Sequence, residues 1–467
     1  MSKIFSVLFF ALTSVVAFSQ SIEWTAQFGG KKIEHGDAVA VDYDGNVYVS
    51  GTFQGTVDFD PGDQVSELTS DGFTDAYLCK LNKAGHLIWA KRVNGGHSEY
   101  INHLRVDAEG NLYISGRFLT TKLDGTPVNL FVDFETLTDT PAVITYGVDD
   151  VFVAKLNPEG KLLWAKSFGE GLNDHATSME ADEHGNVYVA GCFANVPSDA
   201  TPESQWKSEA TSDGFILKFD SAGNKVFEIS IGSNGIDGVD DLVLDGKGHF
   251  YVSVAFQKTV QVGELETLQN ITSKGELDFM ILKYNVEGIL HQVIQFANEE
   301  GGGSSKLAVN SNGDLYIIGN FRIAWDADAG LNVAPVYATG MVVKNDGYIM
   351  KYNAKGEFQW VNQVGGRYED RFNDIAIDGS DVIHLTGTFM DSVDFDPGDG
   401  IFRINVTGKD FLLKLNSDGE FISVLELEKH ATEGDLTLDL DGNSIVTGKK
   451  VMPTYPDEDA VVMKLAK

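Results

Sequence analysis

Cysteine, proline and basic side chains are scarce in this sequence. Its 467 residues include two Cys, ten Pro, and 35 Lys and Arg against 69 Asp and Glu, for a formal net charge of −34. So acidic a surface repels phosphate backbones and anionic lipids, which excludes nucleic acids and membrane surfaces as partners. Hydrophobic residues make up 43% of the chain, enough for a large core, which excludes a disordered acidic protein. The two cysteines, Cys79 and Cys192, are predicted to be separate thiols.

Long apolar runs are also rare. The run at Ile4–Phe18 follows a Lys and ends near two small residues, Ala17 and Ser19, spaced as in a signal-peptidase site. The run is too short, and its flanks are wrong, for a membrane-spanning helix. We therefore predict a signal peptide at residues 1–19 and a mature single domain at residues 20–467, without membrane insertion. The predicted location is secreted or extracellular, with the periplasm and the cell surface as alternatives.

Helical periodicity and familiar catalytic signatures are missing. No segment of adequate length has apolar residues at i, i+3 and i+4 spacing, which favours an all-β fold. The sequence has no G-x-S-x-G elbow, H-E-x-x-H helix, phosphate-binding Gly loop or C-x-x-C pair. These absences remove the sequence support for the corresponding hydrolase, metalloprotease, nucleotide-binding and redox classes.

A repeat fills almost the whole chain instead. The pattern D-x-x-G-N-x-Y-x-x-G, met first within Val41–Phe53, predicts two strands joined by a tight hairpin, because Gly supplies a positive φ while Asp and Asn cap the turn. A second block, Asp75–Lys91, predicts two more strands at Ala76–Leu81 and Leu87–Val93. The unit occurs in seven copies, about 66 residues apart, which begin at Asp42, Asp107, Asp182, Asp245, Asn310, Asp378 and Asp439.

Seven four-stranded antiparallel units predict an all-β, seven-bladed β-propeller. The two ends of the chain are complementary. The last unit stops at Asp459–Lys467, after its third strand, whereas the mature chain begins with Ile22–Phe28, which matches a fourth strand with Trp24 in the place of Trp89. We predict that the N-terminal strand completes the last blade and closes the ring, which leaves no large open edge.

The repeat resembles a known family. The Gly-Gly approach, V-D-x-x-G-N-V-Y-V-S-G, D-A-Y-L-x-K-L-N and L-I-W-A-K are similar to the seven-bladed propeller repeat of secreted bacterial proteins called SBBP. The segment Val57–Asp63, repeated at Val393–Asp399, resembles forms found in Bacteroidetes-type secreted proteins. The resemblance implies the fold and export, and it carries no catalytic motif.

Residues present in all seven units are expected to serve the blade, because a single axial site does not need seven copies. An Asp opens each third strand and a Lys stands near its end, as Asp75 and Lys80 do in the first unit. The Asp is expected to accept backbone N–H groups of the preceding loop. We predict that each Lys pairs with an acid of the hairpin turn, such as Asp42 or Asp44, because strand direction brings both to one end of the blade.

Strand direction also separates two faces of the ring. One face carries only tight turns, and the other carries the long insertions Arg117–Tyr146, Phe193–Ser212 and Phe321–Asn345, where a functional site is expected. Trp206 and Trp325 lie in these insertions, outside the repeated Trp positions. Two interpretations stay open: they stack on a sugar or a partner, or they pack locally and hold their own loops.

The D-x-D-P-G-D loops are candidate calcium sites. Alternating positions on an extended segment put two carboxylates on one side, as an oxygen-rich Ca²⁺ site needs, while Pro-Gly is equally an ordinary turn. A looser analogue contains Asp326 and Asp328. No cofactor other than calcium is predicted, and the candidate ligands are Asp58, Asp60, Asp63, Asp394, Asp396 and Asp399.

Polar residues of the connections between blades form a third candidate group, near the axis. A ring of acids and histidines at a channel mouth can hold a metal or a carboxylate pair, and solvated acids at a rim are the simpler interpretation. The candidate ligand-binding residues among them are His35, His97, His175, Glu369 and Arg371. The other members of the group are Asp37, Glu99, Asp174, Asp237, Glu299, Asp370, His430 and Glu433.

The leading functional hypothesis is a secreted, non-enzymatic propeller, expected to be monomeric, that binds an extracellular protein or glycan through its long-loop face. The alternative is an extracellular polysaccharide hydrolase or lyase with carboxylates at the axis, which would require two or three carboxylates to converge in an axial pocket.

Overall fold

The structure is a computed structural model that describes residues 21–467 apart from a set of connecting segments. Those segments are 71–73, 94–97, 120–148, 170–173, 195–211, 265–267, 297–304, 322–324, 331–333, 338–344, 399, 406–407 and 454–456. The predicted signal peptide, His97, Trp206, Glu299 and Asp399 lie outside the described residues.

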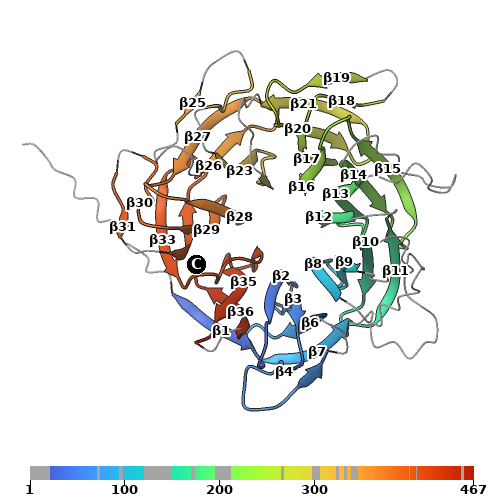
Figure 1. Cartoon of the computed structure of the whole chain (residues 1–467), viewed down its shortest axis with the longest axis vertical. Helices are drawn as coiled ribbons and strands as arrows, with labels where there is room; N and C mark the ends of the chain where they lie inside the picture. The colour runs from blue at the N-terminus through green and yellow to red at the C-terminus, as the bar shows by residue number, and fades with distance from the viewer. Residues whose placement is uncertain are drawn as a thin grey trace, which may run out of the picture.

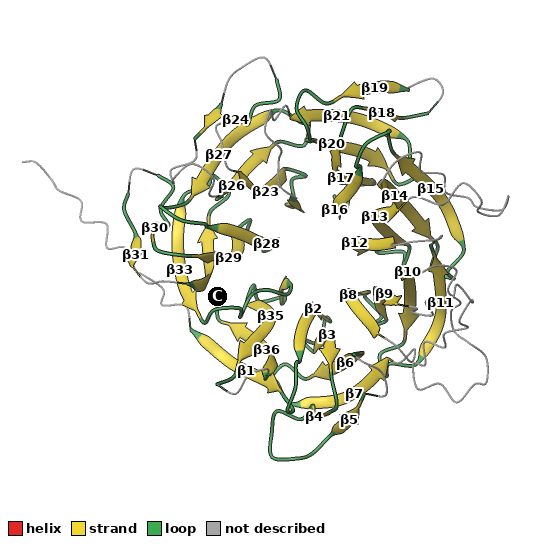
Figure 2. Ribbon diagram, in the orientation of Figure 1, coloured by secondary structure: helices red, strands yellow, loops and turns green. Residues whose placement is uncertain are grey.

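The chain forms a ring of seven four-stranded antiparallel sheets around a central axis (Figures 1 and 2), which confirms the predicted propeller. From the axis outward, blade 1 has β2 (His35–Val41), β3 (Val47–Phe53), β6 (Asp75–Leu81) and β7 (Leu87–Val93). Blade 2 has β8 (Ser98–Val106), β9 (Leu112–Leu119), β10 (Asp149–Leu156) and β11 (Leu162–Phe168). Blade 3 has β12 (Asp174–Ala181), β13 (Val187–Ala194), β14 (Ser212–Phe219) and β15 (Lys225–Ile231).

The remaining blades repeat this order. Blade 4 has β16 (Gly238–Leu244), β17 (His249–Phe256), β20 (Asp278–Asn285) and β21 (Leu290–Phe296). Blade 5 has β22 (Lys306–Val309), β23 (Leu315–Phe321), β26 (Asp346–Tyr352) and β27 (Phe358–Val364). Blade 6 has β28 (Arg371–Ile377), β29 (Ile383–Phe389), β32 (Lys409–Leu415) and β33 (Phe421–Leu427). Blade 7 has β34 (Leu436–Leu438), β35 (Ser444–Val451), β36 (Glu458–Leu465) and β1 (Ile22–Phe28).

The N-terminal strand closes the ring, as predicted. Strand β1 pairs antiparallel with β36, with Phe28 opposite Ala460 and Thr25 opposite Met463. Figure 1 shows the two strands side by side where the blue and red ends of the chain meet. Each end of the chain therefore satisfies hydrogen-bonding groups that would otherwise lie on an open sheet edge.

The hairpin turns owe their shape to the repeated Asp and Gly. In blade 1, Asp42 Oδ1 accepts the backbone N–H of Asp44 at 3.0 Å and of Asn46 at 2.8 Å. Gly45 has a φ of 81°, a conformation that favours glycine over residues with a Cβ. The same side-chain bonds recur in blades 2, 3 and 7, so the motif is a structural hairpin.

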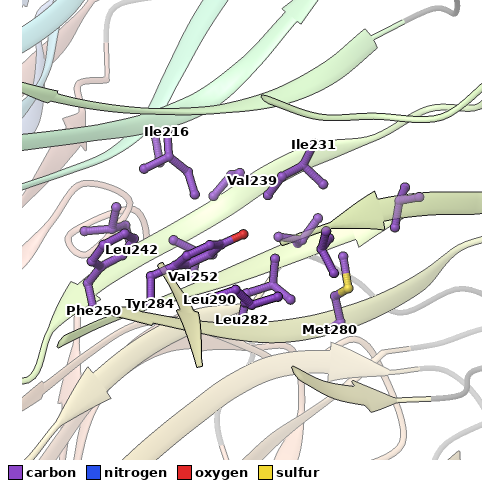
Figure 3. Close-up of a cluster of buried hydrophobic side chains, with 14 of the residues drawn as sticks. Ile216, Ile231, Val239, Leu242, Phe250, Val252, Met280, Leu282, Tyr284 and Leu290 are labelled. Carbon is purple, nitrogen blue, oxygen red and sulfur yellow. The ribbon is translucent and has the colours of Figure 1, made fainter. Parts of the chain in front are cut away.

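The core is divided among the interfaces between blades. The buried apolar residues form seven clusters, one between each pair of neighbouring blades, including the junction of blades 7 and 1. Figure 3 shows the cluster between blades 3 and 4, where Ile216 and Ile231 face Leu242, Val252 and Tyr284. Both faces of each blade are covered, which explains why the strands are almost continuously apolar.

The prediction that third-strand lysines pair with hairpin acids is confirmed in five blades. Lys80 lies 3.3 Å from Asp42, and its Nζ also donates to Tyr48 Oη at 2.6 Å. The other four ammonium groups lie within 4.0 Å of a turn acid, in the pairs Lys155–Asp107, Lys283–Asp245, Lys351–Asp314 and Lys464–Asp439. Lys218 donates instead to the carbonyl of Val286, and Lys467 takes the ion pair with Asp378 in blade 6.

Four two-stranded ribbons lie on the outer rim in Figure 1. They are β4 (Thr56–Asp58) with β5 (Glu67–Thr69), β18 (Thr259–Val262) with β19 (Gln269–Thr272), β24 (Trp325–Asp326) with β25 (Pro335–Val336), and β30 (Ser392–Asp394) with β31 (Arg403–Asn405). Each ribbon extends the connection between the second and third strands of its blade.

Cys79 and Cys192 are free thiols, as predicted. Burial raises the pKa of the Cys192 thiol to about 11. In the part of the chain that the structure describes, no helix has the length and apolar character needed to cross a bilayer.

Candidate functional site

A β-bulge in the inner strand of the blades directs one side chain toward the axis. In blade 1 the pairing of β2 with β3 shifts register between Gly36 and Ala38, so Asp37 is the extra residue. The same shift occurs in β8, β12, β16 and β28. A bulge re-aims the side chains that follow it, and here it turns the residue four positions before the hairpin Asp toward the channel.

The channel contains a cavity of about 400 Å³. All seven inner strands line it with their second halves, so it lies toward the end of the channel nearest the tight hairpins. Arg105 and Glu180 lie in its wall. In each blade, we call the residue four positions before the first residue of the hairpin turn the channel position. Six of the seven residues at this position line the cavity, and Ala38 of blade 1 does not. From blade 2 to blade 7, the six are His103, Ser178, Asp241, Lys306, Asp374 and Asp435.

The residue type at the channel position varies from blade to blade, unlike the residue types at the other repeated positions. The third-strand Lys is the same residue in all seven blades, and the hairpin acid is Asp in six of seven. At the channel position, by contrast, five residue types occur, with both signs of charge. The packing of the blade therefore does not fix the residue at this position, and the cavity wall has different side chains on different sides.

Opposite charges pair across neighbouring blades in the cavity. Arg105 Nη2 donates to Glu180 Oε1 at 2.8 Å, and Lys306 Nζ lies 3.8 Å from Asp241 Oδ1. The carboxylate of Asp241 raises the pKa of Lys306, which holds the ammonium charged. Burial, together with the positive Lys306 and Arg105, lowers the pKa of His103 to about 3, so its imidazole is neutral.

Asp374 and Asp435 form a carboxyl pair in the same cavity. Burial in the channel wall raises the pKa of Asp374 well above its ordinary value, and the neighbouring charge and hydrogen bond of Asp435 raise it further. Burial and the neighbouring Asp435 therefore both disfavour the ionised form of Asp374.

The channel carboxylates also tie neighbouring blades together. Asp374 Oδ2 accepts the backbone N–H of Leu436 at 2.8 Å, and Asp241 Oδ2 accepts that of Leu307 at 2.8 Å. Asp435 Oδ2 accepts from Val39 at 3.4 Å across the closing junction. The second oxygen of Asp374 accepts the N–H of Ile375 at 2.9 Å, and that of Asp435 accepts the N–H of Leu436 at 3.1 Å. These bonds fix the side chains in the wall, which preorganises the polar lining.

Of the axial residues predicted from the blade connections, those that the structure describes do not line the cavity. His35 Nε2 lies 2.8 Å from Glu458 Oε2, and His175 Nδ1 lies 3.8 Å from Asp149 Oδ2. Arg371 pairs with Glu369 in its own connection, its Nε donating at 3.1 Å. Each is held by a local acid, and none of these residues lines the cavity.

Trp325 has the local-packing role. It is 6% exposed, and its ring lies 4.9 Å from that of Tyr348 and 5.7 Å from that of Phe279. The indole therefore closes the outer end of the core between blades 4 and 5, and an exposed stacking platform is not present at this residue.

The D-x-D-P-G-D carboxylates are engaged in turns. Asp58 Oδ1 accepts from the N–H of Asp60 at 3.1 Å and of Ser66 at 2.8 Å, and Asp60 Oδ1 accepts from Gly62 at 2.7 Å. Asp394 and Asp396 make the same bonds in blade 6. Within the described ranges, the group of three acids close enough to share an ion is a different one: Glu34, Asp457 and Asp459. Calcium at the D-x-D-P-G-D loops, including Asp63, stays a prediction.

The cavity residues were missed from the sequence, although a signal was present. Counting four residues back from each hairpin Asp gives the seven channel residues directly. The bulge hides this signal. Strict alternation, counted back from the apolar residues before the turn, places the residue four positions before the hairpin Asp on a face of the blade and not in the channel.

Comparison with known proteins supports a repeat protein and goes no further. No protein-family model matches the sequence. Over 195 residues, 39% of this chain, it is 25% identical to an uncharacterized WD repeat-containing protein of Acanthamoeba polyphaga mimivirus, of which it covers 13%. Over 225 residues, 47% of the chain, it is 26% identical to the regulatory protein FlaEY of Caulobacter vibrioides, of which it covers 23%. The chain thus spans less than a quarter of either relative.

Solved structures of low identity cover nearly the whole chain. A protein of unknown function from Dyadobacter fermentans is 12% identical, with a TM-score of 0.40 over 96% of this chain and 98% of that one. A polysaccharide lyase described as an ulvan lyase is also 12% identical, with a TM-score of 0.47 over 96% of each chain. These likenesses show the fold alone.

Proposed function

We propose that the protein is an exported binding module that holds a hydroxyl-rich ligand, such as a terminal part of a glycan, in the axial cavity. The observation that carries the proposal is the set of non-equivalent side chains at the channel position. A volume of about 400 Å³ lies within the range of small-molecule sites. Export rests on the N-terminal segment predicted as a signal peptide.

The polarity of the lining favours a sugar over an apolar ligand. The neutral His103, the carboxyl group of Asp374, Lys306 and the Arg105–Glu180 pair supply donors and acceptors from different directions around the axis. Fixed polar groups that converge on one volume bind a ligand whose hydroxyls match them and discriminate against ligands that leave them unpaired. The long-loop face remains available for a larger partner that carries the sugar.

A glycan array with residues 20–467, followed by calorimetry on the best ligand, tests the proposal. Lys306→Met and Asp435→Asn should each weaken binding at least tenfold, whereas Lys83→Met, on an exposed turn, should leave it unchanged. Equal affinity of the wild type and both cavity variants, with the variants folded by their thermal transitions, would place the ligand elsewhere.

An axial enzyme is the second candidate, because two carboxyl groups, those of Asp374 and Asp435, meet in the cavity. Glycosidases keep their two carboxyl groups about 5–9.5 Å apart, so that the scissile bond or a water fits between them. Asp374 and Asp435 instead interact directly, which leaves no such gap. A reducing-end assay on array-selected polysaccharides separates the candidates: turnover lost in both Asp374→Asn and Asp435→Asn supports the enzyme, and binding without turnover supports the module.

A further inference from the structure

Two pairs of neighbouring blades each place one base and one acid in the axial cavity. Between blades 2 and 3, Arg105 Nη2 donates to Glu180 Oε1 at 2.8 Å. Between blades 4 and 5, Lys306 Nζ lies 3.8 Å from Asp241 Oδ1, and the carboxylate of Asp241 is the main cause of the raised pKa of Lys306. The charges of these four residues therefore balance within their own pairs.

Blades 6 and 7 place two acids in the cavity instead. Asp374 and Asp435 interact directly, and neither forms an ion pair with a basic side chain in the part of the chain that the structure describes. Burial and the charge of Asp435 raise the pKa of Asp374, and the opposing charge of Lys306 does not offset them. The third pair of blades thus lacks the base that the other two pairs have.

The cavity consequently has an excess of acid. Among the described residues, its wall contains four carboxyl groups, two basic groups and the neutral His103. These groups act on one another across the volume: burial opposes the charge of Arg105, yet Glu180 and Asp435 raise its pKa. Uncompensated negative charge in a partly buried volume favours a positively charged ligand, because the low dielectric strengthens the attraction.

The acid pair also has acceptor capacity and space for a ligand. Asp374 and Asp435 each accept two backbone N–H groups. A carboxylate has about four lone-pair sites, so each group can accept further hydrogen bonds. Blade 1, which borders Asp435, lines the cavity only with Val39, Ala40 and Val41, so no polar side chain of that blade fills the space beside the pair.

An ammonium group fits this pair better than a metal ion does. Ca²⁺ takes about six to eight oxygen ligands, and within the described ranges no third acid or histidine lies close enough to Asp374 and Asp435 to share an ion with them. A primary ammonium group carries one positive charge and three N–H donors, which two carboxyl groups can accept without further ligands.

We propose that the ligand of the axial cavity is an amino sugar whose primary ammonium group is bound by Asp374 and Asp435 together. The inference rests on the function proposed above and names the class of ligand. The ammonium supplies the third pair of blades with the base that it lacks. The hydroxyl groups of the sugar then face Lys306 and the Arg105–Glu180 pair on the other sides of the cavity.

Calorimetry of residues 20–467 with glucosamine, glucose and N-acetylglucosamine tests the inference, because these sugars share one ring and differ in the group on one carbon. At a pH at which its amine is charged, glucosamine should bind at least tenfold more tightly than the other two. Asp374→Asn and Asp435→Asn, which keep an acceptor oxygen, should each abolish this preference, and either variant suffices if the other does not fold. Asp44→Asn, on an exposed turn, should retain it.

The outcomes separate this inference from the proposed function. Equal or tighter binding of glucose or N-acetylglucosamine, or a preference that survives in the folded Asp→Asn variants, overturns the amine and leaves a neutral sugar in the cavity. Failure of glucosamine to bind at millimolar concentration also overturns it, and the proposed function fails with it if the glycan array yields no ligand.

Putrescine, a diamine without hydroxyl groups, separates an amino sugar from other amines. It should bind at least tenfold more weakly than glucosamine, because it leaves the other polar groups of the cavity unpaired. Equal binding of the two would overturn the sugar, and with it the proposed function, and would assign the cavity to a polyamine.

Discussion

The turn acids and the third-strand lysines that pair with them, together called the hairpin frame, lie close to the axial channel. The frame has nearly the same residues in every blade, whereas the channel position has different residues in different blades. In the frame, Lys155 pairs with Asp107 at 3.3 Å, and the arrangement is repeated in most blades. In the channel, four residues before the turn, His103, Lys306 and Asp435 occupy equivalent positions with different chemistry. Repetition therefore marks residues that make a blade, and variation marks residues that can make a site.

The frame is expected to carry the larger stability effects, and two of its turns allow a matched test. Asp107 and Asp182 make the same bonds to their own turns, but only Asp107 has a lysine within ion-pair distance, since Lys218 donates to Val286. We expect Asp107→Ala to cost about 3 kcal/mol and Asp182→Ala about 2 kcal/mol, because both lose the side-chain hydrogen bonds of their turns and Asp107→Ala also leaves the Lys155 ammonium without its carboxylate.

Urea unfolding of both variants and the wild type measures the difference. Equal costs would show that the lysine contributes nothing to the turn, and the frame would then consist of hairpin hydrogen bonds alone.

A smaller effect is expected from pH at Asp370, a buried acid that directly precedes the inner strand of blade 6. Burial raises the pKa of Asp370, which is 2% exposed, from 3.8 to about 6. Between these values the folded chain holds a proton that the unfolded chain has lost, so stability falls as pH rises from about 4 to about 6. The change is on the order of 2 kcal/mol, and the full stability is present below about pH 4.

The slope of Tm against pH in this window should be smaller in Asp370→Asn than in the wild type. The exposed Asp44→Asn serves as the control with an unchanged slope. A variant slope equal to that of the wild type would remove Asp370 from the titrating groups, whatever the change in absolute Tm from the lost acceptor.

The frame could be predicted from the sequence, and the channel could not, for a physical reason. Period-two patterning and the D-x-x-G-N turn fix strands such as Val47–Phe53 and Leu87–Val93, which the structure reproduces to the residue. The apolar residues Ala38–Val41 indicate only the second half of β2, which begins at His35 because the bulge at Asp37 lets pairing continue past a break in the pattern. Strict alternation along the strand does not reveal such a break, so the channel residues are found only by counting back from the hairpin Asp of each blade.

The junction of the first and last blades shows the same limit. The complementary ends of the chain predict that β1 completes blade 7, and the structure confirms it. The meeting of Glu34 with Asp457 and Asp459 requires in addition the path of the connection at residues 29–34, which no repeat in the sequence specifies. Contacts set by repeated patterns are predictable here, whereas contacts set by irregular connections are not.

The smallest stability effect is expected at the axis, where a matched pair of lysines sharpens the comparison. Lys155 lies over the ring of Tyr113, 4.7 Å from its centroid, and beside a buried acid, whereas Lys306 lies in the cavity wall 3.8 Å from Asp241, which keeps its bond to Leu307. We expect Lys155→Met to cost about 2 kcal/mol and Lys306→Met less than about 1 kcal/mol, since a half-exposed ion pair contributes little.

Urea midpoints give both values, and a cost at Lys306 equal to that at Lys155 would make the axial ring part of the frame. Retained stability with lost ligand binding in Lys306→Met is the combination that assigns the residue to recognition, because a structural lysine would lose both together.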